Sequence, residues 1–531
     1  MLRFLFRRDL TESNVSRFVR HFSLEANSVQ KKQVPVSCND SEDNSKVLIR
    51  FPSKFYQHSF DSFESMIAKE KSDAKSYILI EDKTNGKLDS IPKEALEKIL
   101  DSSITQMYKY HLGSRGYCLV KLDDYENFAD RNNKNFQHQS FPVYARMFSL
   151  LPNSLKLIKD ELSTEPVVIP DLLRNRKCWL KFIHEKNNMD SNEFIDNLVN
   201  SVLLNEVEAK LRFFLINQFE ELLCTGPFNR CQVYPFGSSV NGFGWNQSDI
   251  DLFLTPETLK SPKDNAYGLT SASSQNIAGD NNDTKRVLQM LHGIINEFVP
   301  AVKDVNAILM ARVPIIKFDS IASGLNVDLS FFLDSRDSGI DIAHVLYEYS
   351  RLDVRVVKLM IFVKLWAMQQ GITRSAPGVW INSFGLMMLV VHFLQVRSPP
   401  LLPPISHLNV IYDPYQASVT KQTNDLCYDY KTPFMTLLKE FFDHYARFEF
   451  ENYGCNVSDG LLIKKPSSNS ALYIQNPTHR YLNVSKNVQN TELAKLVLIA
   501  RASHDIISRG DHVSSLLKPF SRKSINIGDL Y

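Results

Sequence analysis

Two aspartates, Asp249 and Asp251, stand two positions apart in a run of strand-forming residues. Side chains two apart on a strand project from the same face, so these two carboxylates would lie side by side. Neighbouring carboxylates repel each other unless one is protonated or a cation bridges them. Hard divalent ions such as Mg²⁺ take oxygen ligands of this kind. The pair therefore predicts a site for divalent metal ions.

A Gly-Ser pair, Gly237 and Ser238, comes shortly before these aspartates. Backbone N–H groups in such a turn, together with the serine hydroxyl, can bind the oxygens of a phosphate chain. The whole stretch, residues 236–254, reads FGSSVNGFGWNQSDIDLFL. It predicts a site that holds a nucleoside triphosphate together with metal ions.

A third aspartate, Asp328, is the one charged residue inside the apolar run 325–332, LNVDLSFF. A lone aspartate on a half-exposed strand is compatible with a simple surface residue. Beside an Asp-x-Asp pair, however, a third carboxylate on a neighbouring strand is what a two-metal centre requires. The candidate catalytic and metal-binding residues are therefore Asp249, Asp251 and Asp328.

The elements that must position these residues follow from the hydrophobic periodicity. Apolar residues at helical spacing predict one long helix over residues 191–223, ahead of the Gly-Ser turn. Residues 313–319 and 325–332 are expected as strands on either side of a turn. The polar stretch 256–284 is interpreted as a mobile surface insertion, followed by a helix over 284–299.

Apolar periodicity continues through the C-terminal part of the chain. Helices are expected over residues 351–370, 384–396, 437–445 and 491–507. The proline-rich segment 398–404, SPPLLPP, must end the second of these helices. A rigid connection inside a domain explains this segment better than a proline-rich ligand does.

Residues 46–151 are expected to form a small α+β unit. Its strands are predicted at 47–51, 76–80 and 116–122, with a helical segment near 60–69.

The third of these strands, with the sequence RGYCLVKL at 115–122, weakly resembles the signature strand of the RNA-recognition motif. In that fold exposed aromatic side chains stack on bases. Leu48 and Leu119 occupy the positions where such aromatics are needed, and only Tyr117 remains. A packing or dimerisation domain is therefore favoured over an RNA-binding one.

The composition bounds the class of protein. With 531 residues, 44% hydrophobic and 23% charged, the chain is typical of a soluble multidomain protein. A formal net charge of +2 excludes a wholly basic nucleic-acid coat, so any nucleic-acid binding must come from a local patch. The seven scattered cysteines form no CxxC pair and favour a reducing compartment. The longest apolar run, residues 384–396, is too short to cross a bilayer, so no membrane anchor is predicted.

The first 25 residues combine five arginines with leucine, phenylalanine, serine and threonine. That composition is typical of an amphipathic mitochondrial presequence, although Asp9 and Glu12 are unusual for one. A disordered basic N-terminus is the alternative. The polar stretch 31–45 is interpreted as a linker.

At this point the motifs resemble a known family. Gly237-Ser238, the Asp249-x-Asp251 pair and Asp328 are together similar to the signature of the DNA polymerase β-like nucleotidyltransferases. Other stretches resemble the noncanonical poly(A) and poly(U) polymerase branch: LDVR at 352–355, VKLWA at 363–367, NSF at 382–384 and NVSKNV at 483–488. Within that branch, three stretches resemble the mitochondrial poly(A) polymerases of animals: APGVWI at 376–381, RSPPLLP at 397–403 and LYIQNP at 472–477.

The resemblance implies an α+β fold in several domains. A nucleotidyltransferase palm, a mixed sheet with helices, would occupy residues 190–345, and a helical nucleotide-binding domain residues 346–510. Residues 46–151 would be a degenerate RNA-recognition-like α+β domain through which the chain forms a homodimer. Residues 1–40 would be the presequence and linker, and residues 511–531 a tail.

The resemblance also implies a role for each site residue. Asp249 and Asp251 would bind both of two Mg²⁺ or Mn²⁺ ions, and Asp328 only the catalytic one. Gly237 and Ser238, next to Phe236, would hold the triphosphate of ATP.

Residues of the helical domain would complete the nucleotide site. Lys364 would neutralise the triphosphate and Ser383 would add a hydroxyl group. Phe384 falls where relatives place an aromatic ring that stacks on the base.

The implied activity is template-independent addition of adenylates from ATP to RNA 3′ ends in the mitochondrial matrix. Three positions depart from the pattern of relatives. Met368 replaces a second phosphate-binding lysine, and Ile342 lies near the position of an asparagine that touches the ribose. Leu482 replaces a histidine of the uridylyl-adding relatives, which favours ATP.

Other functions remain compatible with these residues. A terminal uridylyltransferase or a mixed-nucleotide tailing enzyme would share every catalytic residue. An RNA-binding pseudo-transferase is disfavoured because the three carboxylates are retained. A transferase acting on a small nucleotide or an antibiotic is disfavoured by the N-terminal unit and the long helical domain.

Overall fold

The computed structural model describes most of the chain between Ser62 and Phe520. The described residues are 62–130, 136–138, 146–158, 169–175, 179, 189–224, 228–256, 277–331, 339–374, 376, 378–408, 428–429, 431–466 and 470–520. All of them fall in one compact unit, Ile49–Tyr531. The predicted presequence, the linker and the strand at 47–51 lie outside the described residues, as does most of the predicted insertion.

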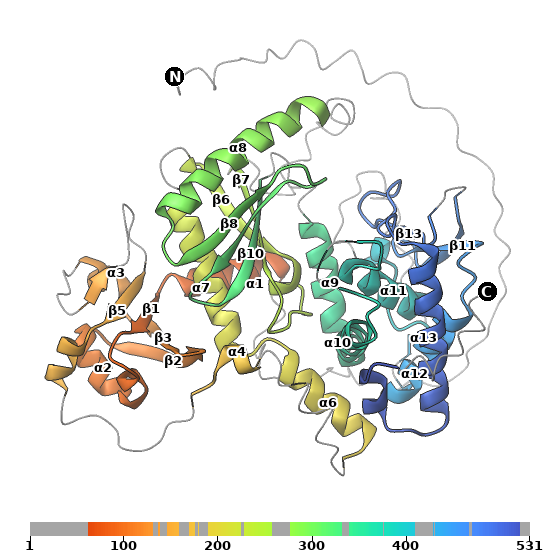
Figure 1. Cartoon of the computed structure of the whole chain (residues 1–531), viewed down its shortest axis with the longest axis horizontal. Helices are drawn as coiled ribbons and strands as arrows, with labels where there is room; N and C mark the ends of the chain where they lie inside the picture. The colour runs from red at the N-terminus through yellow and green to blue at the C-terminus, as the bar shows by residue number, and fades with distance from the viewer. Residues whose placement is uncertain are drawn as a thin grey trace, which may run out of the picture. The chain divides into compact units, whose positions relative to one another are not determined.

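The N-terminal part is an α+β unit built on a five-stranded sheet (Figure 1). Its elements are α1 (Phe63–Ala74), β1 (Tyr77–Asp82), α2 (Lys93–Leu100), β2 (Ile104–Leu112), β3 (Arg115–Leu122), α3 (Tyr125–Asp130), β4 (Phe136–His138) and β5 (Met147–Leu150). The strand order is β2-β3-β1-β5-β4, with β3 antiparallel to β1 and β5 parallel to β1. Strands β2, β4 and β5 and helix α2 were not predicted from the sequence.

The two faces of this sheet are buried in different cores. Ile78 and Val120 pack on one side with the apolar residues of α2. On the other side Tyr117, only 2% exposed, stacks on Tyr110 with the ring centroids 5.3 Å apart. The Tyr110 hydroxyl donates to the Ala322 carbonyl, 2.9 Å away in the next domain. Tyr117, the one aromatic left for base stacking, is therefore a core residue.

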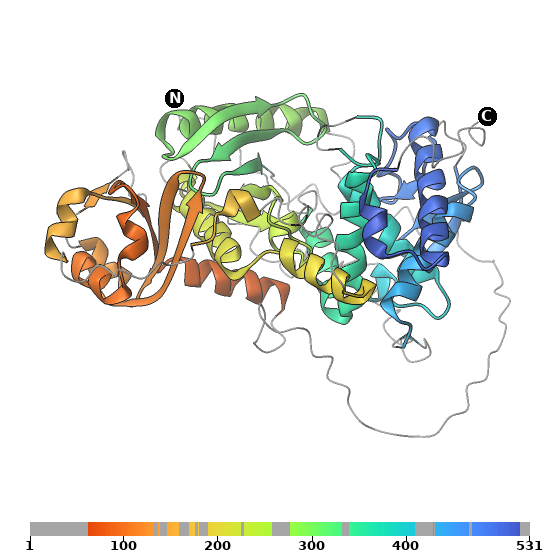
Figure 2. The same ribbon diagram turned by 60° about the horizontal axis from the view of Figure 1, so that its bottom comes forward.

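The central domain is a second five-stranded sheet with helices on one face. Its elements are α7 (Glu206–Leu223), β6 (Cys231–Phe236), β7 (Ile250–Pro256), α8 (Ile277–Phe298), β8 (Val302–Ile308), β9 (Ile315–Ser320) and β10 (Leu325–Phe331). The helix before them, α6 (Ser191–Val202), packs its apolar residues into the core of the C-terminal helical part. The strand order is β6-β7-β10-β9-β8, and only β7 and β10 run parallel. Helix α8 follows the strands along one side (Figure 2). This mixed sheet confirms the predicted α+β fold class.

The single helix predicted over 191–223 is wrong, because the chain breaks between α6 and α7. The Leu204 N–H donates to the Gly244 carbonyl, 3.2 Å away, and Leu203 forms a bridge with Trp245. Asn205 then starts α7 with a reciprocal capping box formed with Glu208. The break thus binds the loop that leads to the candidate aspartates. Helix α8 also differs from its prediction, since it begins at Ile277 and not near residue 284.

The C-terminal part is mainly helical. Its elements are α9 (Ile340–Leu352), α10 (Val354–Gln369), α11 (Ser383–Val396), α12 (Phe434–Arg447), β11 (Tyr453–Asn456), β12 (Leu461–Lys464), β13 (Ile474–Gln475) and α13 (Asn490–Ser508). The helix predicted from residue 351 is wrong at its start: Asp353 ends α9 and caps α10 by accepting from the Arg355 N–H at 2.7 Å. The small sheet β12-β11-β13 was not predicted.

Trp366 of α10 lies at the centre of this helical domain and is fully buried. Its ring packs on Phe442 of α12 with the centroids 4.9 Å apart, and its indole N–H donates to the Ser503 hydroxyl of α13 at 2.9 Å.

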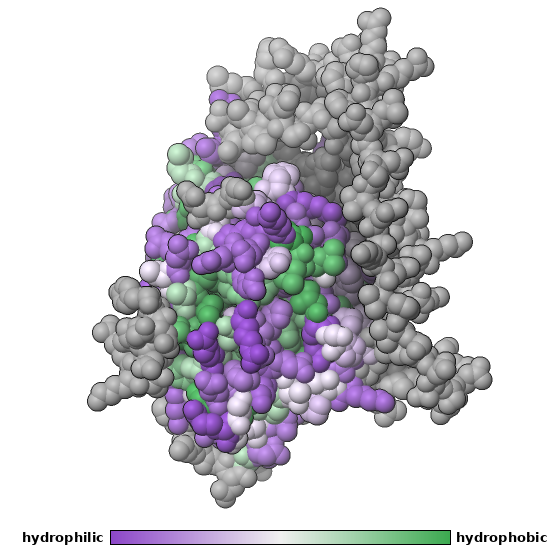
Figure 3. Space-filling view, turned by 90° about the vertical axis from the view of Figure 1, so that its right-hand side faces the viewer, coloured by the Kyte–Doolittle hydropathy of each residue, from purple (hydrophilic) through white to green (hydrophobic). Residues whose placement is uncertain are grey.

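On the face shown in Figure 3, the coloured residues are mostly hydrophilic, with apolar residues lying between the polar ones. Among the described residues no helix is both long enough and apolar enough to cross a membrane.

Candidate active site

Four side chains stand in register across the central sheet. Phe236 on β6 pairs with Asp251 on β7, and Asp251 pairs with Asp328 on the parallel strand β10. Asp328 in turn pairs with Lys317 on the antiparallel strand β9. Directly paired residues project from the same face of a sheet, so this register brings the second and third predicted aspartates together.

Asp249 joins this row from the residue just before β7. The Lys317 ammonium lies 3.5 Å from Asp249 Oδ2 and 3.0 Å from Asp328 Oδ1. The Asn326 side-chain amide donates to Asp249 Oδ1 at 3.4 Å. The three predicted carboxylates therefore form one cluster, and a lysine and an asparagine that were not predicted connect its members.

Gly237 approaches this cluster more closely than any other residue type could. Its φ of +62° lies in the left-handed region, and a Cβ atom there would stand 2.2 Å from Asp251 Oδ2. The next residue, Ser238, donates its hydroxyl to the Asp249 carbonyl at 3.3 Å. The structure thus brings the predicted Gly-Ser pair against the aspartates, as a phosphate site beside a metal site requires.

The loop between the Gly-Ser pair and Asp249 is bound by Arg212 of α7, which is only 1% exposed. Its guanidinium donates to the carbonyls of Ser248 at 2.7 Å, Asp249 at 3.2 Å and Trp245 at 3.5 Å. A guanidinium offers five N–H donors in a fixed plane, so a single arginine can bind all three carbonyl groups. Arg212 therefore fixes the backbone that carries the first aspartate.

The electrostatics of the cluster favour binding of a cation. Burial, together with the charges of Asp328 and Asp249, raises the pKa of Asp251 to about 7. Burial also raises the pKa of Asp328, against the opposing effect of its hydrogen bond with Lys317. For Lys317, burial opposes the ammonium form, but the hydrogen bond and charge of Asp328 dominate and the pKa is raised. The carboxylates therefore need positive charge, and Lys317 supplies one.

Oxygen ligands of this kind suit Mg²⁺ or Mn²⁺, and the raised pKa of Asp251 and Asp328 agrees with that use. In the part of the chain that the structure describes, however, no three metal-ligating side chains converge closely enough to hold an ion as they stand. Lys317 bridges two of the three carboxylates. The donor set thus fits a divalent ion in its chemistry, while Lys317 supplies the positive charge in this arrangement.

Lys364 of α10 reaches this site from the helical domain. Burial lowers the pKa of Lys364 to about 8, against the opposing effect of the Asp249 and Asp251 charges. The structure thus brings the predicted phosphate-neutralising lysine within the electric field of the cluster.

Ser383 and Phe384, the other two predicted nucleotide-binding residues, begin α11 after the cap Asn382. Ser383 is exposed, whereas Phe384 is half-buried against the core of the helical domain. The structure does not bring either side chain into hydrogen-bonding contact with the three described carboxylates. Their place at a helix N-terminus, where backbone N–H groups are free to bind an anion, is compatible with their predicted roles.

The three positions that depart from relatives lie in the helical domain. Ile342 and Met368 are half-buried and pack against its core. Leu482 precedes Asn483, whose side chain accepts from the Ile474 and Ser485 N–H groups, at 3.0 and 2.9 Å, and donates to the Leu472 carbonyl at 2.8 Å. Asn483 therefore shapes the loop and is not free to bind a nucleotide as it stands.

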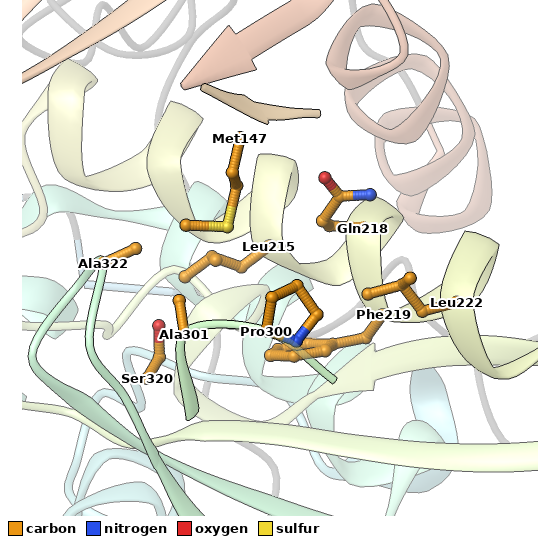
Figure 4. A pocket seen from close by; sticks show the side chains of 9 residues that line it. All are labelled: Met147, Leu215, Gln218, Phe219, Leu222, Pro300, Ala301, Ser320 and Ala322. Atoms are coloured by element: carbon orange, nitrogen blue, oxygen red, sulfur yellow. The ribbon is translucent and has the colours of Figure 1, made fainter. Parts of the chain in front are cut away.

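An apolar hollow elsewhere in the molecule is not part of this site. Figure 4 shows it between β5, α7 and the strands β8 and β9. Its lining is Met147, Leu215, Gln218, Phe219, Leu222, Pro300, Ala301, Ser320 and Ala322. None of the candidate site residues belongs to this lining, so the hollow is a packing feature where the N-terminal unit meets the central domain.

The chain is similar in sequence and in fold to known proteins. Residues 192–351 match the family described as the central palm domain of mitochondrial-like poly(A) RNA polymerases. The mitochondrial poly(A) RNA polymerase of Homo sapiens is 35% identical over 335 residues, which cover 60% of this chain and 57% of that protein. The enzyme of the same name from Drosophila melanogaster is 33% identical over 328 residues, covering 59% of this chain and 53% of that one.

A solved structure of mtPAP in complex with ATPγS agrees with a TM-score of 0.68 at 27% identity, covering 86% of this chain and all of that one. A structure of mtPAP with UTP agrees with a TM-score of 0.69 at 26% identity and the same coverage. The resemblance to mitochondrial poly(A) polymerases is thereby confirmed. The chain spans little more than half the length of the curated relatives that it matches.

Proposed function

We propose that this protein is an RNA nucleotidyltransferase that adds adenylates from ATP to the 3′ ends of RNA in mitochondria, without a template. The observation that carries the proposal is the register of Asp251 against Asp328, with Gly237 in contact with the first and Asp249 bridged to the second. The names of the relatives, poly(A) RNA polymerases of mitochondria, support the choice of reaction and compartment.

In the proposed site Asp249 and Asp251 hold two Mg²⁺ or Mn²⁺ ions, and Asp328 shares the catalytic one. When bound, such ions lower the pKa of the RNA 3′-hydroxyl and stabilise the leaving pyrophosphate. Asp328, whose pKa is raised by burial, is placed to accept the proton of that hydroxyl. Lys317, which contacts Asp249 and Asp328, would compete with such ions for these two carboxylates.

The triphosphate of ATP lies along the turn beside Asp251 in this proposal. The N–H groups of Gly237 and Ser238 bind its oxygens, and the missing side chain of Gly237 lets the phosphate approach the carboxylates. Lys364 neutralises the charge that builds up on pyrophosphate, and Ser383 adds a hydroxyl donor. Phe384 stacks on the base, with Phe236 supporting the start of the turn.

The base of the nucleotide is the least constrained feature. The solved relatives carry ATPγS, UTP, CTP or GTP, so a bound nucleotide by itself does not separate adenylate addition from uridylate addition. The proposal of ATP is supported by the names of the relatives. It is also supported by Leu482, at the position where the family resemblance implies a histidine in uridylyl-adding enzymes.

The decisive experiment is extension of a labelled RNA primer with all four nucleoside triphosphates in competition and Mg²⁺ or Mn²⁺ present. Tails made almost wholly of adenylate support the proposal. Tails of uridylate or of mixed nucleotides would reassign the enzyme within the same reaction class. Absence of both extension and pyrophosphate release would overturn the enzyme assignment and favour an RNA-binding role.

We further propose that the chain works as a homodimer through its N-terminal unit and is imported into the mitochondrial matrix by residues of its N-terminus. Light scattering of the purified protein, with and without residues 1–151, tests the first point. Import into isolated mitochondria, followed by protease protection in mitoplasts and N-terminal sequencing, tests the second. A monomer, or a chain that stays accessible to protease, would remove the corresponding statement.

A further inference from the structure

The Lys364 ammonium lies 4.3 Å from the centroid of the Trp245 indole ring. Lys364 belongs to α10 of the helical domain, and Trp245 belongs to the loop that joins the Gly-Ser pair to Asp249. A cation above the face of an aromatic ring is attracted by the negative potential of that face, and tryptophan gives the strongest attraction. The contact therefore links the helical domain to the loop that bears the first aspartate.

The backbone that carries the indole ring is held in place by hydrogen bonds. Trp245 is 7% exposed, its backbone N–H donates to the Ser248 hydroxyl at 3.3 Å, and its carbonyl accepts from the Ser248 N–H at 3.0 Å and from Arg212 at 3.5 Å. The residue after it, Asn246, donates its N–H to the Val202 carbonyl at 3.0 Å. The backbone of Trp245 is thus held by α7 on one side and by the end of α6 on the other.

The lysine, in contrast, has a long side chain with four rotatable bonds. Ordering such a chain costs up to about 2 kcal/mol of conformational entropy. Lys364 is half-buried, and burial lowers the pKa of its ammonium group to about 8. A cation in this situation gains more from an aromatic face than an exposed one does.

We propose that Trp245 is a positioning residue of the nucleotide site: its indole face holds the Lys364 ammonium in place beside the carboxylates, ready to receive the triphosphate of ATP. This inference rests on the proposed function, since it assigns Lys364 to the phosphates. It adds a residue outside the Gly-Ser and aspartate motifs that sets the affinity for the nucleotide.

The alternative is that Trp245 only fills the core, since it belongs to the same buried cluster as Phe243 and Trp366. The two roles predict different responses to substitution. Loss of packing lowers stability for any smaller side chain in this loop. Loss of the cation contact weakens ATP binding, and this effect requires Lys364. Another aromatic ring at position 245 should restore the binding.

The test compares the variants Trp245→Leu and Trp245→Phe with the control Phe243→Leu, which removes a buried ring from the same loop. The measurements are KM and kcat for ATP in RNA extension, direct binding of ATP in the presence of Mg²⁺, and the melting temperature. We expect Trp245→Leu to raise KM and Kd for ATP by between about threefold and thirtyfold, with kcat changed less than about threefold. Trp245→Phe should recover most of the affinity for ATP. Phe243→Leu should keep the wild-type affinity for ATP, although its melting temperature falls as much as that of Trp245→Leu.

A double-mutant cycle with Lys364→Met then isolates the contact. We expect Trp245→Leu to have no further effect on ATP binding once Lys364 is replaced. Equal losses of affinity in both backgrounds, or equal losses in Trp245→Leu and Phe243→Leu, would overturn the inference. If the wild-type protein binds ATP but extends no RNA, the proposed function fails, while the binding cycle still decides the role of Trp245.

Discussion

Asp251 and Asp328 occupy paired positions on the two parallel strands of the central sheet, 77 residues apart in the chain. The pairing puts two carboxylates on one face, where burial already disfavours their charged forms. Such an arrangement is costly for folding unless cations compensate it. The cost is explained if the cluster exists to bind the ions and the nucleotide of the proposed reaction.

Replacement of Asp328 tests the cluster most directly. We expect Asp328→Ala to lower RNA extension by more than about a hundredfold, because the proposed reaction needs this carboxylate. The fold should be kept, because the substitution that ends the ion pair with Lys317 also removes one of the mutually repelling carboxylates. The measurement is primer extension at fixed Mg²⁺ concentration, with circular dichroism to check the fold. Asp319→Ala, on the neighbouring strand β9, is the control and should keep normal activity. Tails of normal length from Asp328→Ala would contradict the assignment.

Replacement of Gly237 separates backbone strain from steric contact. An alanine at φ +62° is strained by about 1–2 kcal/mol, and its Cβ would also stand 2.2 Å from Asp251 Oδ2. Gly86 has a φ of +86°, and a Cβ atom added there would meet nothing within 4 Å, so Gly86→Ala suffers the strain alone. We expect both variants to melt at lower temperature, but only Gly237→Ala to lose most of its RNA extension. Equal activity in the two variants would show that the close approach to Asp251 has no functional role.

The sequence predicts the candidate carboxylates because their signal is local. Asp249 and Asp251 are two residues apart, and Asp328 is conspicuous as the one charge in an apolar strand. Lys317 and Asn326 were missed, although their strands were predicted. Their roles depend on the register between β9, β10 and β7, which no single strand encodes. The role of Arg212 was missed for a similar reason, because the carbonyl groups that it binds belong to a loop more than thirty residues away in the chain.

Two of the errors in the helices concern a break between consecutive helices. Leu203 and Leu204 continue the apolar periodicity of residues 191–223, and this continuity hides the break, which pairing with Gly244 and Trp245 fixes. A local signal was nevertheless present, because Asn205 is followed three residues later by Glu208, as in a capping box. Asp353 is likewise a residue that commonly caps helices, and the end of α9 could have been read from it.

Replacement of Lys317 tests what stabilises the carboxylate cluster when no metal ion is bound. Lys317 lies 3.0 Å from Asp328 and 3.5 Å from Asp249, so its loss leaves the carboxylates to repel each other. We expect Lys317→Met to melt at lower temperature than the wild type in EDTA and to be stabilised more by added Mn²⁺. The control is Lys303→Met, which removes an exposed lysine from the neighbouring strand β8. A metal-induced stabilisation equal to that of the wild type would show that Lys317 does not compete with a cation for these carboxylates.

A buried histidine, His392, and a half-buried one, His444, predict an acid-sensitive helical domain. Burial lowers the pKa of His392 and of His444 to about 4 each. In the unfolded chain both would titrate near pH 6.5, so the unfolded state binds more protons between pH 6.5 and pH 4. Stability is therefore fully present above pH 6.5 and falls as the pH drops through this window, by up to about 1.4 kcal/mol per pH unit for each histidine.

The variant His444→Phe tests this expectation, because His444 already packs among the rings of Phe393, Tyr445 and Phe448. Urea unfolding at pH 7.5 and pH 5.0 should show a smaller loss of stability for this variant than for the wild type. If His444→Phe loses as much stability as the wild type between these two pH values, His444 is not held neutral by burial.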